Sequence, residues 1–123
     1  MNIQELATLA DLRLNVKIIL INNRCLGLVR QQQEMFFEEN YFASRFISNP
    51  DFTALAMCFG IKGHRLTKDN PANQLKQILA EDGPCLIEVP INQAYNVLPM
   101  VPPGSPHFTM IGGKADDALR TDS

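Results

Sequence analysis

The sequence predicts an α/β fold in which helices cover a parallel β-sheet. Two short apolar segments rich in β-branched residues, 16–21 and 85–89, have the pattern of strands that are buried on both faces. Segments with apolar residues at helical spacing lie between and around them. Pairs such as Asn22-Asn23 and Gly83-Pro84 interrupt the chain where these segments end. Alternating helices and strands favour parallel pairing and a layered α/β architecture.

The first half of the chain begins with an amphipathic helix, predicted over 3–13. Asn2 and Glu5 are spaced as in a capping box at its start. The segment 16–21 follows at once and has the pattern of a central strand. Gly27 to about Glu39 predicts a second helix, and the mixed aromatic and charged segment 37–48 predicts an irregular loop.

The second half begins with a helix start at Asn49-Pro50-Asp51, with Pro50 at the first helical position. The helix carries a stripe of Phe52, Leu55, Ala56 and Phe59, and Gly60 is suited to end it. Residues 63–66 predict a short strand, and Asn70-Pro71 a further helix. The strand 85–89 comes next, and after Pro90 both patterns fade into a proline-rich extended segment. The inward residues of the Asn70-Pro71 helix are expected to be Leu75, Ile78 and Leu79.

Composition excludes several classes of function. The chain has 123 residues and a net charge of −2, without the basic excess that a nucleic-acid partner requires. No apolar run approaches the roughly 20 residues needed to span a bilayer, and the first residues lack the pattern of a signal peptide. Three widely spaced cysteines disfavour a zinc site or a disulfide framework, which leads us to expect reduced thiols and a cytoplasmic protein: Cys25, Cys58 and Cys85.

Ligands of parallel sheets bind beyond the carboxyl ends of the strands, which directs attention to residues 22–29. Taken alone, Asn22-Asn23 is more simply explained as turn chemistry. Two further stretches change the interpretation, namely Leu26-Gly27-Leu28-Val29-Arg30-Gln31 and residues 96–104, Asn-Val-Leu-Pro-Met-Val-Pro-Pro-Gly. With the Asn-Asn pair and the start Met-Asn-Ile-Gln-Glu-Leu, they resemble the C-terminal, thiamine-diphosphate-binding domain of acetolactate synthase large subunits.

The resemblance implies a binding site for the diphosphate of the cofactor and its Mg²⁺. It implies that Asn23 supplies a side-chain amide oxygen to the metal and that Cys25 supplies its backbone carbonyl. Both are oxygen ligands of the kind that Mg²⁺ takes. It further implies that the cofactor is lined by Leu26, Gly27, Leu28 and Val29, at a helix start that favours an anion. Gln32 would lie where many members carry a tryptophan that faces the substrate.

For the domain, the resemblance implies three layers, flavodoxin-like, formed by residues 1–112, with 113–123 as a polar, disordered tail. The family motif begins with a Gly-Asp-Gly upstream of the position that Met1 matches, so we expect a fragment with no catalytic residue of its own, inactive alone. The parent enzyme would decarboxylate pyruvate and transfer the two-carbon unit to pyruvate or 2-oxobutyrate, for branched-chain amino-acid biosynthesis. The resemblance also implies FAD as a cofactor of the parent, held mostly by other domains. The implied partners of the parent are small 2-oxo acids and a regulatory subunit.

Several of these features also have a purely structural explanation, which stays open. Without the resemblance, the run Gln31-Gln32-Gln33 is best explained as a solvated helix face, and the Cys25 thiol as a small buried hydrophobe. The aromatic residues of 36–46 suit packing or a lid equally. A non-catalytic α/β binding module would need a phosphate loop such as GxGxxG, which is absent. The apolar strand 16–21 predicts a homo-oligomer, and a purely self-assembling module is the remaining alternative.

Overall fold

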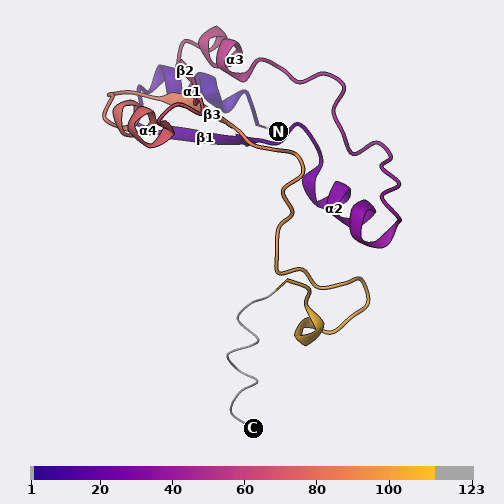
Figure 1. The fold of residues 1–123 in the computed structure, drawn as a ribbon. Helices are drawn as coiled ribbons and strands as arrows, with labels where there is room; N and C mark the ends of the chain where they lie inside the picture. The colour runs from indigo at the N-terminus through magenta and orange to yellow at the C-terminus, as the bar shows by residue number, and fades with distance from the viewer. Residues whose placement is uncertain (1, 113–123) are drawn as a thin grey trace, which may run out of the picture.

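A computed structural model of the protein describes residues 2–112 and contains a parallel three-stranded sheet with helices on both faces (Figure 1). The strands β1 (Lys17–Asn22), β3 (Cys85–Pro90) and β2 (Lys62–Arg65) lie side by side in that order. Both pairings to β3 are parallel. The α/β class and the layered parallel sheet are therefore confirmed.

The first face of the sheet is covered by α1 (Glu5–Asp11) and α3 (Phe52–Cys58). Their apolar side chains form one core with the residues of β1 and β3 that point to this side. Its buried members are Leu6, Ala56, Ile61 and Leu86, with Ile18, Leu20, Phe52 and Phe59 packed against them. The predicted stripe along 52–59 is thus the face that α3 turns to the sheet.

The opposite face is covered by α4 (Pro71–Leu79), which begins at an Asn70 cap as predicted. The core on this side contains Leu66, Ile78, Cys85 and Ile87, with Leu75 and Val89 partly buried against it. The expectation that Leu79 points inward is wrong, because its side chain is exposed at the end of the helix. Two helical layers with the sheet between them make the three layers that the resemblance implied.

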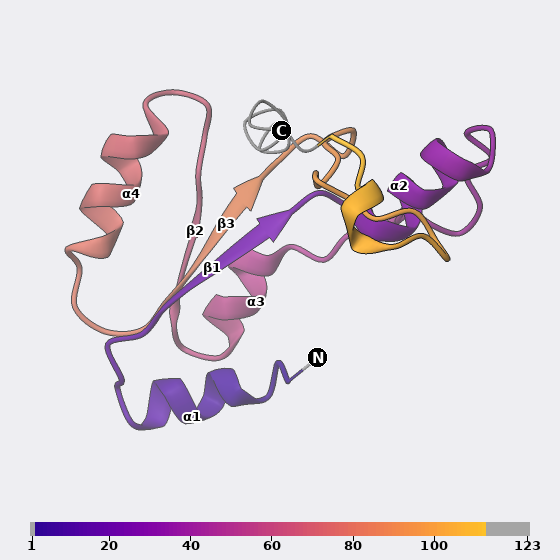
Figure 2. The same ribbon diagram turned by 90° about the horizontal axis from the view of Figure 1, so that it is seen from below.

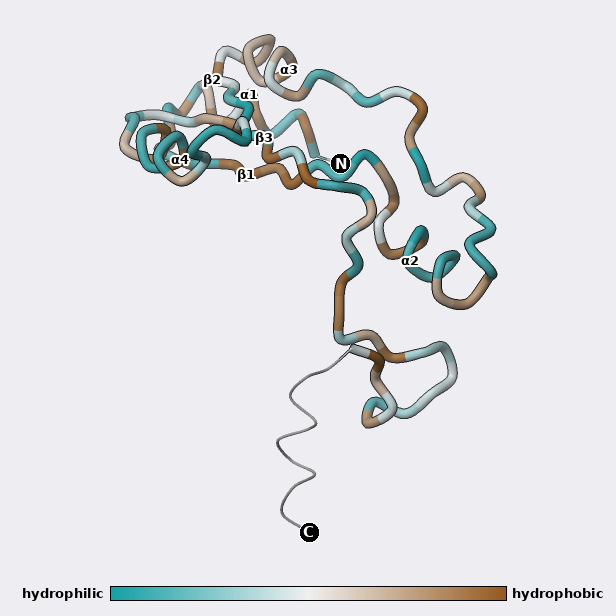
Figure 3. Tube along the Cα trace, in the orientation of Figure 1, coloured by the Kyte–Doolittle hydropathy of each residue, from teal (hydrophilic) through white to brown (hydrophobic). Residues whose placement is uncertain are grey.

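The prediction that 16–21 is a central strand is wrong within the described part of the chain. The central strand is β3, whose first four residues are buried, whereas β1 is at the edge of the sheet. Ile19 and Ile21 of β1 are 48% and 57% exposed, because α4 covers β3 but does not extend over them. Figure 3 shows that β1 is nevertheless drawn in the brown of hydrophobic residues. Hydropathy alone cannot tell an uncovered strand from a buried one.

Two predicted helix starts also differ from the structure. Gln4 is the N-cap of α1, without a side-chain cap, and Asn2 takes a positive φ of 48°, so no capping box forms with Glu5. The cap of α3 is Asp51, whose carboxylate accepts hydrogen bonds from the N–H groups of Thr53 and Ala54, so Pro50 precedes the helix. Carboxylate oxygens are strong acceptors for the free N–H groups of a first turn.

The helix α2 (Gly27–Phe36) and residues 91–112 lie beside each other, away from the sheet, as Figures 1 and 2 show. The loop predicted over 37–48 is irregular. The segment after Pro90 contains turns and the short 3₁₀ helix η1 (His107–Thr109), and it folds back on itself at an antiparallel bridge between Met100 and Ile111, so it is not extended throughout. The tail predicted over 113–123 lies outside the described residues. Among residues 2–112, no helix combines the length and the apolarity needed to cross a bilayer.

Candidate functional site

The predicted cofactor residues lie in the turn that joins β1 to α2 and in the first residues of α2. β1 ends at Asn22 and α2 begins at Gly27, so only four residues separate the strand from the helix. The arrows of β1 and β3 point toward α2 in Figure 2, which puts this turn at the carboxyl edge of the sheet. That edge is where ligands of parallel sheets bind.

The turn carries the two predicted metal ligands, Asn23 and Cys25, which lie two positions apart in the chain. The Asn23 side-chain Oδ1 accepts a hydrogen bond from the Cys25 N–H at 3.2 Å, which folds the side chain back over the turn. Arg24, between them, takes a left-handed φ of 57°. Within residues 2–112, no donor forms a hydrogen bond with the Cys25 carbonyl oxygen. The Cys25 side chain itself is buried, so its thiol contributes packing.

Gly27 leaves room for the Asn23 side chain. A Cβ atom built on Gly27 would stand 2.7 Å from Asn23 Nδ2, closer than such atoms approach in proteins. The α2 N-terminus has no side-chain cap, and its first N–H groups have no partner within the helix. An amide oxygen, a carbonyl without a donor and free N–H groups suit a hard cation bound together with an anion. The residues of the turn thus fit Mg²⁺ and a diphosphate.

The three apolar residues predicted to line the cofactor gather at the start of α2. Leu26, Leu28 and Val29 are all exposed, at 47%, 63% and 42%. Exposed apolar side chains beside polar anchoring groups are the usual wall of a small-molecule site. Their assignment to the cofactor stays a prediction.

The loop 37–48 also supports the turn, through backbone hydrogen bonds. The Leu26 N–H donates to the Ser44 carbonyl at 2.8 Å, and the Phe46 N–H donates to the Arg24 carbonyl at 3.1 Å. These two hydrogen bonds form an antiparallel bridge between Cys25 and Arg45. No local pattern announces this pairing, because it joins residues some twenty positions apart.

The three glutamines Gln31, Gln32 and Gln33 on α2 differ in burial and in hydrogen-bond partners. Gln31 is fully buried, so its interpretation as part of a solvated face is wrong. Gln33 is half-buried and donates to the Phe42 carbonyl at 2.8 Å. Gln32 is exposed, and its proposed contact with substrate stays a prediction.

Sequence reasoning missed a row of polar side chains that crosses the carboxyl edge of the sheet. Asn49 donates to Asn22 at 2.9 Å, Asn22 donates to Glu88 at 2.6 Å, and Arg65 donates to Glu88 at 2.7 Å. Arg65 also reaches Asp51 at 3.4 Å. These residues line a cavity of about 280 Å³, together with Arg24, Pro50, Pro90 and Ile91. The signal that could have found Glu88 is a lone carboxylate in an otherwise apolar strand.

Most of the chain is similar in sequence to known proteins. The chain is 45% identical to the acetolactate synthase isozyme 2 large subunit of Escherichia coli K12 over 112 residues, and 43% identical to the isozyme 1 large subunit over 113 residues. It is 48% identical to the acetolactate synthase large subunit of Lactococcus lactis over 112 residues. Each alignment covers 89% to 91% of this chain.

The chain spans about a fifth of the length of these relatives, with 20%, 20% and 19% covered. A sequence profile described as "Thiamine pyrophosphate enzyme, C-terminal TPP binding domain" matches residues 1–89, which contain the whole sheet except Pro90 as well as the turn and α2. The chain therefore belongs to the family of C-terminal, thiamine-pyrophosphate-binding domains of thiamine pyrophosphate enzymes.

Proposed function

We propose that this chain is the part of an acetolactate synthase large subunit that holds the diphosphate end of the cofactor and its Mg²⁺. The observation that carries the proposal is the Asn23–Gly27 turn, in which an amide oxygen and a carbonyl oxygen stand before an uncapped helix start. Mg²⁺ would be held by Asn23 Oδ1 and the Cys25 carbonyl oxygen. The N–H groups that open α2 would face the diphosphate, with Leu26, Leu28 and Val29 as its apolar wall.

In the reaction of acetolactate synthase, two 2-oxo acids condense with loss of CO₂. The cofactor, when bound, supplies the electron sink that makes the decarboxylation possible. The residues of this chain bind and orient the cofactor, and the side chain of Gln32 would face the second substrate, pyruvate or 2-oxobutyrate. The FAD of the parent would be held mainly outside this chain.

We also propose a cytoplasmic location, supported by the free thiols of Cys25, Cys58 and Cys85.

We propose that the protein assembles into homo-oligomers, and that a regulatory subunit accompanies the parent in some members. Ile19 and Ile21 on the edge strand β1 support self-assembly, because an apolar edge strand is a template for pairing with another chain. Light scattering of the 123-residue chain at tens of micromolar tests this. A dimer or a larger species is expected, and a monomer would contradict self-assembly.

The proposed function is tested in a hybrid subunit, in which residues 1–112 of this chain replace the matching region of the E. coli isozyme 2 large subunit. We expect the hybrid to form acetolactate from pyruvate only when both thiamine diphosphate and Mg²⁺ are supplied. Asn23→Ala should weaken Mg²⁺ binding at least tenfold in calorimetric titrations, because it removes a ligand to the metal.

Asn92→Ala is the matched control for that variant. Asn92 Oδ1 accepts from the Ala94 N–H at 2.9 Å, so it forms the same kind of turn as Asn23 but outside the proposed site. It should leave Mg²⁺ affinity unchanged. A hybrid that binds neither the metal nor the cofactor, or equal effects of the two substitutions, would refute the proposed function.

A further inference from the structure

The carboxylate of Glu88 connects the last residues of the two edge strands. Glu88 is 3% exposed on the central strand β3. Its Oε1 accepts from Asn22 Nδ2, at the end of β1, at 2.6 Å. Its Oε2 accepts from Arg65 Nε, at the end of β2, at 2.7 Å. Both oxygens are thus occupied by donors from opposite sides of the sheet.

The Asn22 side chain also forms a hydrogen bond with the turn that precedes α2. Its Oδ1 accepts from the Arg24 N–H at 3.0 Å and from Asn49 Nδ2 at 2.9 Å. Arg24 has a left-handed backbone conformation, which costs free energy in a residue other than glycine. The hydrogen bond from Arg24 to Asn22 therefore helps to hold a strained residue that lies between Asn23 and Cys25.

Glu88 and the Arg24 N–H together determine which way the Asn22 amide faces. An ionised carboxylate can only accept hydrogen bonds, so the NH₂ end of Asn22 must point to Glu88 and the oxygen end must point to the Arg24 N–H. With the amide reversed, two oxygens would face each other at Glu88, and the Arg24 N–H would face an NH₂ group. A glutamine at position 88 could present either its oxygen or its NH₂ group to Asn22, so it would impose this orientation less strictly.

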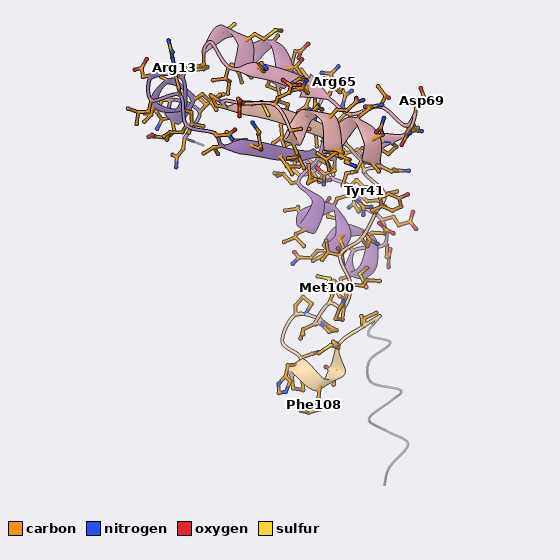
Figure 4. All side chains as sticks on the ribbon, turned by 90° about the vertical axis from the view of Figure 1, so that its left-hand side faces the viewer. Arg13, Tyr41, Arg65, Asp69, Met100 and Phe108 are labelled. Carbon is orange, nitrogen blue, oxygen red and sulfur yellow. The ribbon has the colours of Figure 1, made fainter. Side chains whose placement is uncertain are left out.

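Arg65 makes the buried carboxylate tolerable. A carboxylate removed from water is costly unless a charged partner and hydrogen bonds compensate it. Arg65 supplies the charged partner and one of the hydrogen bonds. Figure 4 shows Arg65 on the layered part of the molecule, apart from the region of Met100. Its second contact, to Asp51 at the α3 cap, holds the guanidinium at the same edge of the sheet.

We propose that Glu88, supported by Arg65, is a positioning residue for the metal-binding turn and acts through Asn22. This inference rests on the proposed function, because it assigns Glu88 the task of presenting the oxygens of Asn23 and Cys25 to Mg²⁺. Glu88 itself donates no ligand to the metal. Its loss should therefore raise the Mg²⁺ concentration that is needed and leave the turnover rate at saturating Mg²⁺ largely unchanged.

The first test is Glu88→Gln in the hybrid subunit. A glutamine has one acceptor oxygen and one NH₂ group, so it cannot accept from both Asn22 and Arg65. We expect the Kd for Mg²⁺, measured calorimetrically with thiamine diphosphate present, to rise at least tenfold, while kcat at saturating Mg²⁺ changes less than threefold. The matched control is Glu81→Gln, which removes the charge that pairs with Lys62 at 2.6 Å at the opposite end of the sheet and should leave this Kd unchanged.

A double variant separates positioning from a general loss of stability. In Glu88→Gln with Arg65→Met, the competing donor is gone, so the oxygen of the new glutamine is free to face Asn22. We expect the double variant to bind Mg²⁺ more tightly than Glu88→Gln alone. A purely structural role predicts the reverse, because each substitution would add its own damage.

A second measurement uses the 123-residue chain without the rest of the enzyme. Hydrogen exchange followed by NMR should show faster exchange of the Arg24 N–H in Glu88→Gln, but not in Glu81→Gln. If a hybrid variant does not fold, this exchange decides the inference. Unchanged Arg24 exchange, or an unchanged Kd for Mg²⁺ in Glu88→Gln, overturns it. A wild-type hybrid that binds no Mg²⁺ would instead overturn the proposed function.

Discussion

The side chain of Gln31 pairs with the backbone of Val97 through two hydrogen bonds. Gln31 Nε2 donates to the Val97 carbonyl, and Gln31 Oε1 accepts from the Val97 N–H, both at 2.8 Å. Next to it, the buried Arg30 donates to Asn96 and to the Ala94 carbonyl. Figure 4 shows Met100 close below α2, where this segment continues. The helix that opens the candidate site is thereby fastened to the proline-rich segment.

Gln31→Ala should loosen the attachment of residues 97–100 to α2, while Arg30 still holds Ala94 and Asn96. The substitution removes both hydrogen bonds to Val97, and each such bond contributes about 0.5–1.5 kcal/mol to the unfolding free energy. The expected observation is faster hydrogen exchange at Val97 and earlier protease cleavage within 94–112. Gln32→Ala, at the exposed neighbouring position, should change stability by less than about 0.5 kcal/mol. Equal behaviour of the two variants would show that the pairing contributes nothing.

Gly27→Ala should harm metal binding without a matching loss of stability. Alanine is favoured over glycine in helices by roughly 0.5–1 kcal/mol, but its Cβ would stand 2.7 Å from Asn23 Nδ2. The Asn23 side chain must therefore move, and we expect Mg²⁺ affinity in the hybrid subunit to fall at least tenfold.

Gly60→Ala provides the opposite control. Gly60 has a φ of 78° and no neighbour near a Cβ, so alanine there strains the backbone without touching the turn. Its melting temperature should fall while its Mg²⁺ affinity is retained. If Gly27→Ala binds Mg²⁺ as tightly as the unsubstituted hybrid, the Asn23 side chain does not need its observed position.

The Asp51 cap should make α3 sensitive to acid. Hydrogen bonds from Thr53 and Ala54, with the charge of Arg65 as a smaller contribution, lower the pKa of Asp51 below its ordinary value of 3.8. A group whose pKa is lower in the folded state stabilises the fold fully above its unfolded pKa, and this contribution is lost as the pH falls through the folded value. The loss should therefore begin near pH 3.8 and continue below it.

Asp51→Asn keeps an acceptor oxygen but cannot ionise, so its unfolding free energy should fall less than that of the wild type between neutral pH and about pH 2, the range in which a depressed carboxyl pKa acts. Asn70→Ala is the control, because it removes the uncharged cap of α4 and should cost the same at both pH values. Parallel pH profiles for wild type and Asp51→Asn in denaturant titrations would contradict this account.

Gln32→Trp should raise the preference for 2-oxobutyrate over pyruvate as second substrate. The two acids differ by one methylene, which an apolar pocket discriminates by about 1–3 kcal/mol. A tryptophan offers a wide apolar surface to that carbon, whereas a glutamine offers less apolar area and a polar amide that is costly to remove from water. We expect roughly a tenfold rise in the ratio of the two products, about 1.4 kcal/mol. The ratio is measured in a competition assay, in which the hybrid subunit receives pyruvate and 2-oxobutyrate together. An unchanged ratio would show that Gln32 does not face the second substrate.

Local patterns in the amino-acid order were enough to predict the kinds of elements and to single out the turn after β1 as the candidate site. Periodicity and turn residues are short-range signals, so the strands at 17–22 and 85–90 and the helices beginning at Gly27 and Pro71 follow from residues close to one another in the chain. The rule that parallel sheets bind ligands at their carboxyl edge then directed attention to 22–29. The apolarity of 16–21, however, did not predict whether the strand is central or at an edge.

Contacts between distant residues were settled only by folding. Asn22 meets Glu88, and Gln31 meets Val97, across 66 positions of sequence in each case. Whether a glutamine is buried or a glutamate is bound on both sides depends on which donors and acceptors the packed sheet and helix bring to it. A polar residue on a periodic helix is compatible with solvent or with a buried partner, because both satisfy its hydrogen bonds. The order β1-β3-β2, which makes the last strand the centre of the sheet, has the same long-range origin.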